Sequence, residues 1–91
     1  MKYYTIYAWS ECPFCVKAKA LLIEKGHMVK YVVLDHASDL LVKYKSIYNM
    51  KTVPIIVYKD EDLQIEKTIG GYTDLVKHFS SGSKNNTGVD D

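Results

Sequence analysis

Two cysteines three positions apart, Cys12 and Cys15, constrain this chain more than any other feature. The pair follows an apolar run at residues 3–8 that predicts a buried strand. It precedes a segment with helical spacing (Phe14, Ala18, Leu21, Leu22) that closes at Gly26. A Cys-x-x-Cys motif between a strand and a helix favours thiol–disulfide exchange.

The chemistry of a helix start explains this spacing. Cys12 would cap the helix, where unpaired backbone N–H groups and the helix dipole stabilise a thiolate. Pro13 suits the first helical position because its missing N–H is not needed there. Cys15 lies one turn further along the same face and can close a disulfide. Cys12 is therefore the expected nucleophile and Cys15 the resolving thiol.

Two other interpretations of the cysteine pair stay open at this point. The pair could be half of a zinc or iron–sulfur site completed by a second chain, or two inert buried thiols. A tetrahedral site within one chain would need two more ligands. The three histidines are scattered and show no paired spacing with the cysteines: His27, His36 and His78. Redox chemistry remains the interpretation that the strand–helix context favours.

Length and composition indicate one small globular domain. A chain of 91 residues, 47% of them hydrophobic, is large enough for a modest core. The formal net charge of +1 gives no indication of nucleic acid or an anionic membrane as a partner. No segment has the length of a transmembrane helix, and no secretory leader is recognisable. Two cysteines in such a chain fit a reducing compartment, so we expect a cytoplasmic protein. We also expect a monomer.

The hydrophobic pattern predicts the order β-α-β-α-β-β-α in an α/β fold. Strands are expected at residues 2–8, 28–34, 55–58 and 63–69, the second of them covered on both faces. The last two strands are so close in sequence that they must form an antiparallel hairpin. We therefore expect one four-stranded mixed sheet with helices on both faces.

Three helices are expected between and after these strands. The first covers residues 13–25. The second follows Ser38, a candidate N-cap, ends near Asn49, and places its apolar residues on one stripe: Leu40, Leu41, Tyr44, Ile47 and Tyr48. Thr73 is a candidate cap of a short third helix with Leu75, Val76 and Phe79 inward. Residues 80–91 have almost nothing to bury and predict a disordered tail after a domain of residues 1–79.

Three motifs in this order resemble those of a glutaredoxin of the two-cysteine type: Cys12-Pro13-Phe14-Cys15, Thr52-Val53-Pro54 and Gly70-Gly71-Tyr72-Thr73-Asp74. The resemblance spans residues 2–79, and the short, tyrosine-rich form is similar to glutaredoxins of some phages and bacteria. One-cysteine glutaredoxins, which assemble iron–sulfur clusters, have serine in place of the second cysteine. The resemblance implies a thioredoxin-like fold, no tightly bound cofactor, and glutathione as co-substrate.

The resemblance also implies roles for individual residues. Cys12 and Cys15 would form the redox-active disulfide, with Pro13 at the helix start and Pro54 as a cis-proline beside the sulfur. Glutathione would bind along Phe14, Lys51, Thr52, Val53, Gly71, Tyr72, Thr73 and Asp74. The backbone of Val53 would pair with its cysteinyl part, and the helix start would hold its γ-glutamyl carboxylate.

Trp9 departs from the family pattern. Glutaredoxins commonly have lysine three residues before the first cysteine, where it meets the glycyl carboxylate of glutathione. The expected activity is reduction of protein disulfides and glutathione mixed disulfides, with ribonucleotide reductase as a family-typical partner. Two alternatives remain: recharging by thioredoxin reductase, and a binding protein that holds an iron–sulfur cluster between two chains. Pro13 disfavours the second, because proline there usually disfavours cluster assembly in the family.

Overall fold

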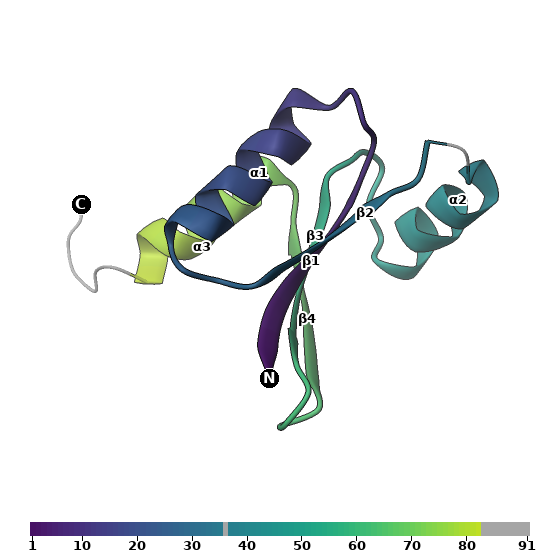
Figure 1. Cartoon of the computed structure of the whole chain (residues 1–91). Helices are drawn as coiled ribbons and strands as arrows, with labels where there is room; N and C mark the ends of the chain where they lie inside the picture. Colours follow the sequence, from purple (N-terminus) through teal and green to yellow (C-terminus); the bar gives the residue numbers. More distant parts are fainter. Residues whose placement is uncertain (36, 83–91) are drawn as a thin grey trace.

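The computed structural model describes residues 1–35 and 37–82, and Figure 1 shows their arrangement. The elements follow the predicted order: β1 (Lys2–Ala8), α1 (Pro13–Glu24), β2 (Val29–Val33), α2 (Ser38–Ile47), β3 (Ile55–Asp60), β4 (Ile65–Gly70) and α3 (Tyr72–Gly82). The third helix runs three residues beyond its expected end. His36 and the tail at residues 83–91 lie outside the described residues.

The four strands form one mixed sheet in the order β2-β1-β3-β4. β1 pairs in parallel with β2 and antiparallel with β3, and β3 and β4 form the predicted antiparallel hairpin. The α/β fold class is therefore confirmed. The expectation that residues 28–34 are covered on both faces was wrong in part, because β2 is an edge strand and Val33 is exposed.

Alternating side chains of β1 divide the core into two clusters. Tyr4, Ile6 and Ala8 face α1 and α3, where they pack with Leu22 and Leu75. Tyr7 faces the other side and packs with the α2 cluster: Leu34, Leu41, Ile55 and Val57. Figure 1 shows α1 and α3 on one side of the sheet and α2 on the other. Because helices cover both faces of the sheet, a functional site is expected at the ends of its central strands.

The ends of α1 agree with the sequence, but the start of α2 does not. Gly26 has a φ of 81° and follows the C-cap of α1. Ala37, not Ser38, is the N-cap of α2, and it makes no side-chain cap hydrogen bond. Leu40 and Ile47 are exposed rather than on a buried stripe. The short α2 packs on the sheet through Leu41 and Tyr44, together with Tyr48 at its C-cap, so only part of the predicted apolar stripe contacts the core.

The third helix also differs from its predicted start and packing. It begins at Tyr72, so Thr73 lies inside its first turn instead of capping it. Leu75 is buried as expected, and Phe79 packs against the same cluster. Val76 is exposed, contrary to expectation. None of the helices in the described residues is both long and apolar enough to cross a membrane.

Candidate active site

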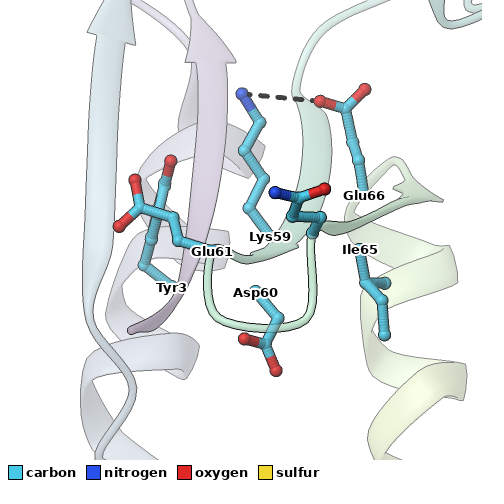
Figure 2. A pocket seen from close by; sticks show the side chains of 7 residues that line it. Tyr3, Lys59, Asp60, Glu61, Ile65 and Glu66 are labelled. Atoms are coloured by element: carbon cyan, nitrogen blue, oxygen red, sulfur yellow. Dashed lines mark ion pairs between the residues drawn. The ribbon is translucent and has the colours of Figure 1, made fainter.

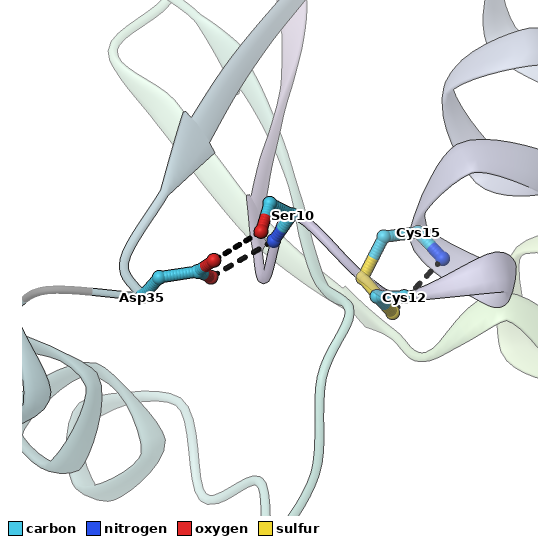
Figure 3. The surroundings of a disulfide bond; sticks show 4 residues. All are labelled: Ser10, Cys12, Cys15 and Asp35. Carbon is cyan, nitrogen blue, oxygen red and sulfur yellow. Dashed lines mark hydrogen bonds between the residues drawn. A yellow bond between two sulfur atoms is a disulfide. The ribbon is translucent and has the colours of Figure 1, made fainter.

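The two cysteines lie at the start of α1, just beyond the end of β1. Cys12 is the N-cap, with extended backbone angles, and its Sγ accepts a hydrogen bond from the main-chain N–H of Cys15 at 3.2 Å. The two sulfurs are joined in a disulfide, with the Cα atoms 5.2 Å apart (Figure 3). Cys12 keeps 9% of its surface exposed and Cys15 keeps 0%. Cys12 is therefore the sulfur of this pair that a second molecule can reach.

A hydrogen-bonded pair holds the loop that leads to Cys12. The main-chain N–H of Ser10 donates to Asp35 Oδ1 at 2.8 Å, and its hydroxyl donates to Oδ2 (Figure 3). Asp35 follows β2, so the contact ties the end of one parallel strand to the loop after its neighbour. The sequence interpretation missed this pair. An acid directly after a strand parallel to β1 was the available signal, since the carboxyl ends of parallel strands meet at one edge.

A groove of about 270 Å³ runs beside the start of α1. The loop before β3, with a cis peptide bond between Val53 and Pro54, forms one wall, and the start of α3 forms another. Its lining includes every residue proposed above for glutathione except Lys51: Phe14, Thr52, Val53, Gly71, Tyr72, Thr73 and Asp74, together with Pro54. Met50 also lines it and was missed. The exposed Lys51 lies outside this lining.

The Gly-Gly segment shapes the α3 side of this groove. Asp74 Oδ2 accepts a hydrogen bond from the main-chain N–H of Gly71 at 2.9 Å, which pairs the third residue of the helix with its cap. Gly70 has a φ of 120°, and a Cβ there would lie 2.8 Å from Asp74 Cγ. Gly70 therefore allows both the turn and the close approach of the Asp74 carboxylate.

Two exposed aromatic rings accompany the cysteine motif. The ring of Phe14 is 54% exposed, and its centroid lies 5.8 Å from that of Tyr72 across the groove. Trp9 is 44% exposed, and the Lys45 ammonium lies 5.9 Å from its ring centroid. Lys45, from α2, therefore lies beside Trp9, the residue that stands where a lysine was expected.

A second pocket, of about 390 Å³, lies at the opposite end of β1 around the β3–β4 turn (Figure 2). Three of its four charged lining residues, Lys59, Asp60 and Glu66, have partners in or beside the turn. Lys59 Nζ lies 3.6 Å from Glu66 Oε1, and the buried Asp60 carboxylate accepts from the N–H groups of Asp62 and Leu63. These contacts stabilise the β3–β4 turn. The groove beside the cysteines is therefore the better candidate for the substrate site. In residues 1–35 and 37–82, no group of three or more His, Cys, Asp or Glu side chains is placed to hold a metal.

The glutaredoxin family model matches residues 4–63, and the chain therefore belongs to the glutaredoxin family. Among solved structures, wheat glutaredoxin is 28% identical with a TM-score of 0.72, over 87% of this chain and 70% of that chain. Glutaredoxin 1 from Francisella tularensis, solved in complex with cacodylate, shares the fold at 24% identity and a TM-score of 0.69. That match covers 89% of this chain and 95% of the other.

One curated relative is a longer protein. Hybrid peroxiredoxin hyPrx5 from Haemophilus influenzae is 34% identical over 76 residues, which make up 84% of this chain. The chain spans only 29% of that relative's length. The fold and the cysteine pair agree with membership of a family of thiol–disulfide oxidoreductases.

Proposed function

We propose that this chain is a glutathione-dependent thiol–disulfide oxidoreductase that reduces protein disulfides and glutathione mixed disulfides. The single observation that carries the proposal is the position of Cys12. Its sulfur caps α1 and is the more exposed of the pair, and Phe14, two residues on, lines a groove of about 270 Å³. A nucleophilic sulfur beside a peptide-sized groove is what exchange with glutathione requires.

In the first step, the Cys12 thiolate attacks the glutathione sulfur of a mixed disulfide. The Cys12–glutathione bond forms as the old sulfur–sulfur bond breaks, and the substrate leaves as a thiolate that takes a proton from water. The N–H of Cys15, 3.2 Å from Cys12 Sγ, stabilises the attacking thiolate and the same sulfur as a later leaving group.

Two routes return Cys12 to its reduced form. On small mixed disulfides, a second glutathione thiolate attacks the glutathione sulfur, releasing oxidised glutathione and the Cys12 thiolate. On a protein disulfide, Cys12 first forms a mixed disulfide with one substrate sulfur and releases the other as a thiolate. The Cys15 thiolate then attacks Cys12 Sγ, the bound substrate sulfur leaves as a thiolate, and the Cys12–Cys15 disulfide forms, as in the structure. Two glutathione molecules then reduce that disulfide and leave as oxidised glutathione.

Glutathione fits the groove through backbone groups at its two walls. The main-chain N–H and C=O groups of Val53, in the loop before β3, can pair with the cysteinyl part of the tripeptide in the manner of an added strand. The first-turn N–H groups of α3, at Tyr72 and Thr73, offer a positive helix end to the γ-glutamyl carboxylate. Glutathione is then a co-substrate that binds and dissociates in each catalytic cycle, and the reaction needs no tightly bound cofactor.

The protein substrate is a disulfide-containing or glutathionylated protein of the cytoplasm, and the chain acts as a monomer. Because a relative is a hybrid peroxiredoxin, a thiol peroxidase is the first protein substrate to test. Ribonucleotide reductase, the family-typical partner, is the second.

A coupled assay tests the proposal and its redox competitor together. A glutathionylated peptide is offered with NADPH and either glutathione plus glutathione reductase or thioredoxin reductase alone. We expect NADPH oxidation with the glutathione system, and its loss in the Cys12→Ser variant. Turnover only with thioredoxin reductase would overturn the glutathione assignment while keeping the thiol chemistry.

A further inference from the structure

A further groove, of about 360 Å³, lies between α1 and α3. The two helices lie together on one side of the sheet (Figure 1). Six residues line this groove, four of them apolar or aromatic: Leu21, Lys25, Tyr72, Val76, Phe79 and Ser80. We call it the α1–α3 groove, and the groove lined by Phe14 and Pro54 the Cys12 groove. The thiol exchange proposed above makes no use of the α1–α3 groove.

The two grooves meet at Tyr72, the first residue of α3. Tyr72 lines both grooves, and its ring centroid lies 5.8 Å from that of Phe14 in the Cys12 groove. Phe14 and Leu21 are seven residues apart on α1, close to two turns, and Tyr72 and Val76 are four apart on α3, close to one turn. The two linings therefore follow one another along the same side of α1 and of α3.

The α1–α3 groove keeps apolar surface in contact with solvent. Val76 is 39% exposed, whereas Leu21 and Phe79 are half-buried and pack in part against the core cluster. Lys25 is the one charged residue of this lining, and its ammonium lies 5.5 Å from the Phe79 ring centroid. The lining therefore offers apolar contact rather than a pattern of charges.

A polypeptide substrate must extend beyond the Cys12 groove. In the orientation proposed above, the γ-glutamyl part of glutathione lies at the start of α3, and this part precedes the cysteinyl residue in the tripeptide. A polypeptide bound in the same direction places the residue before its reactive cysteine at Tyr72 and Thr73. The chain before that residue then continues over the α1–α3 groove, which begins at Tyr72.

We propose that the α1–α3 groove binds apolar side chains three and four residues before the reactive cysteine of a polypeptide substrate. The inference rests on the proposed function, whose protein substrates it narrows. Val76 and Phe79 lie four and seven residues beyond Tyr72, which is about 6 and 10 Å along the helix axis. An extended chain covers these distances in about two and three residues. Counted from the residue beside Tyr72, these are the third and fourth residues before the cysteine.

The size of the preference follows from the partial burial of a leucine side chain. Full burial of a leucine is equivalent to about 12- to 150-fold in affinity. An open groove covers about half of the side chain, which gives the square root of that factor, about 3- to 12-fold. Salt does not screen apolar contact, so the preference should persist near 1 M sodium chloride.

The experiment uses three peptides, each with one cysteine in a mixed disulfide with thionitrobenzoate. The first peptide has leucine at the third and fourth positions before the cysteine, the second has leucine at the third and fourth positions after it, and the third has serine at all four. In the reduced Cys15→Ser variant, the Cys12 thiolate attacks the peptide sulfur and a Cys12–peptide disulfide forms. Thionitrobenzoate leaves with the electron pair of the old bond, because its thiol has the lower pKa. Its colour gives a second-order rate constant, which is divided by that of dithiothreitol with the same peptide.

We expect the first peptide to react about 3- to 12-fold faster than the other two, at low and at high salt. Val76→Asp should bring this ratio close to one, because a carboxylate in the groove loses hydration when the leucines bind. Val42→Asp is the matched control and should leave the ratio unchanged, since Val42 is an exposed valine of α2 outside both linings. Val76→Thr keeps the shape of valine and should give an intermediate ratio, so the test stands even if Val76→Asp unfolds.

Equal rates for the first and second peptides, or a faster second peptide, would overturn the inference and leave the proposed function standing. A ratio unchanged in both Val76 variants would also overturn it. So would a dimer, found by sedimentation and lost in Val76→Asp, because a second copy of the chain would then occupy the groove. If none of the three peptides released thionitrobenzoate faster than with a Cys12→Ser, Cys15→Ser double variant, the proposed function itself would be overturned.

Discussion

The main-chain N–H of Cys15 points at the sulfur of Cys12, 3.2 Å away, across the first turn of α1. The same contact that caps the helix thus places a hydrogen-bond donor on the sulfur that must carry negative charge. Cys15 itself is fully buried behind it. The asymmetry of the two cysteines follows from this single relationship, because one sulfur is capped and reachable and the other is not.

This asymmetry predicts the pH dependence of alkylation. In the reduced Cys15→Ser variant, the rate of Cys12 alkylation should have its midpoint well below about 8.5, the ordinary pKa of a free cysteine. The reason is that the helix end and the N–H of residue 15 favour the thiolate. Iodoacetamide labelling followed against pH measures the midpoint. A value near that of free cysteine would contradict the role given to the helix start.

Gly70 should tolerate alanine less well than Gly26 does. Both have positive φ, but an added Cβ at Gly26 meets nothing within 4 Å, whereas at Gly70 it meets the Asp74 carboxylate. We expect Gly26→Ala to cost about 1 kcal/mol of unfolding free energy and Gly70→Ala about 1–3 kcal/mol more. Urea unfolding of both variants gives the comparison.

Asp74→Ala provides the cross-check on that clash. It removes the carboxylate that Gly70 must accommodate, so Gly70→Ala should cost less in the Asp74→Ala background than alone. Purely additive costs would mean that the Asp74 carboxylate is not the source of the strain, which would then come from the backbone angles of Gly70 or from the Cβ of residue 74, 2.9 Å from the added Cβ and still present in alanine.

The departure at Trp9 gives a kinetic prediction. Trp9→Lys would add a cation at the position where the resemblance leads us to expect one for the glycyl carboxylate, and it should lower the KM for a glutathionylated substrate by about 1.4- to 5-fold. The gain should shrink with salt, and kcat should change less, because Cys12 and α1 are untouched. The melting temperature of the same variant separates binding from packing. A lower melting temperature with no decrease in KM would mean that Trp9 is a packing residue that contacts Lys45.

His78 predicts how stability depends on pH. Burial lowers the pKa of His78 below its usual value of 6.5, and the charges of Lys67 and His27 act in the same direction. Between its folded pKa and 6.5, the unfolded chain binds more protons than the folded chain, so stability should fall as pH is lowered through that window. His78→Leu should flatten this part of the profile, measured by urea unfolding between about pH 7 and pH 5. If the slope of unfolding free energy against pH is the same in His78→Leu, then His78 is not the source of the pH dependence.

The parts of the fold that follow from neighbours in sequence could be predicted. Cys12, Pro13 and Gly26 mark the ends of α1 through local backbone rules, and the helix begins and closes there. The start and stripe of α2 could not, because the exposure of Leu40 depends on where that helix lies against the sheet.

The same limit holds for the candidate site. Except for Met50, the residues that line the groove belong to the three motifs, each of which is local in sequence. The Ser10–Asp35 hydrogen bonds and the Lys45–Trp9 pair join residues far apart in sequence. The acid after β2 indicates the sheet edge at which Asp35 lies but not its partner Ser10, and the Lys45–Trp9 pair has no signal in the sequence. The packing of β2 and α2 around β1 brings the partners together.

The most direct test of the central claim is to trap the mixed disulfide. The reduced Cys15→Ser variant is mixed with a glutathionylated peptide without free glutathione, and intact mass and peptide mapping are recorded, with Cys12→Ser as the matched control. We expect the Cys15→Ser protein to gain one glutathione, mapped to Cys12, with release of the peptide thiol, and the Cys12→Ser protein to gain none. Glutathione on Cys15 of the Cys12→Ser protein at a comparable rate, or no adduct in the Cys15→Ser protein, would contradict the assignment of Cys12 as the glutathione-accepting nucleophile.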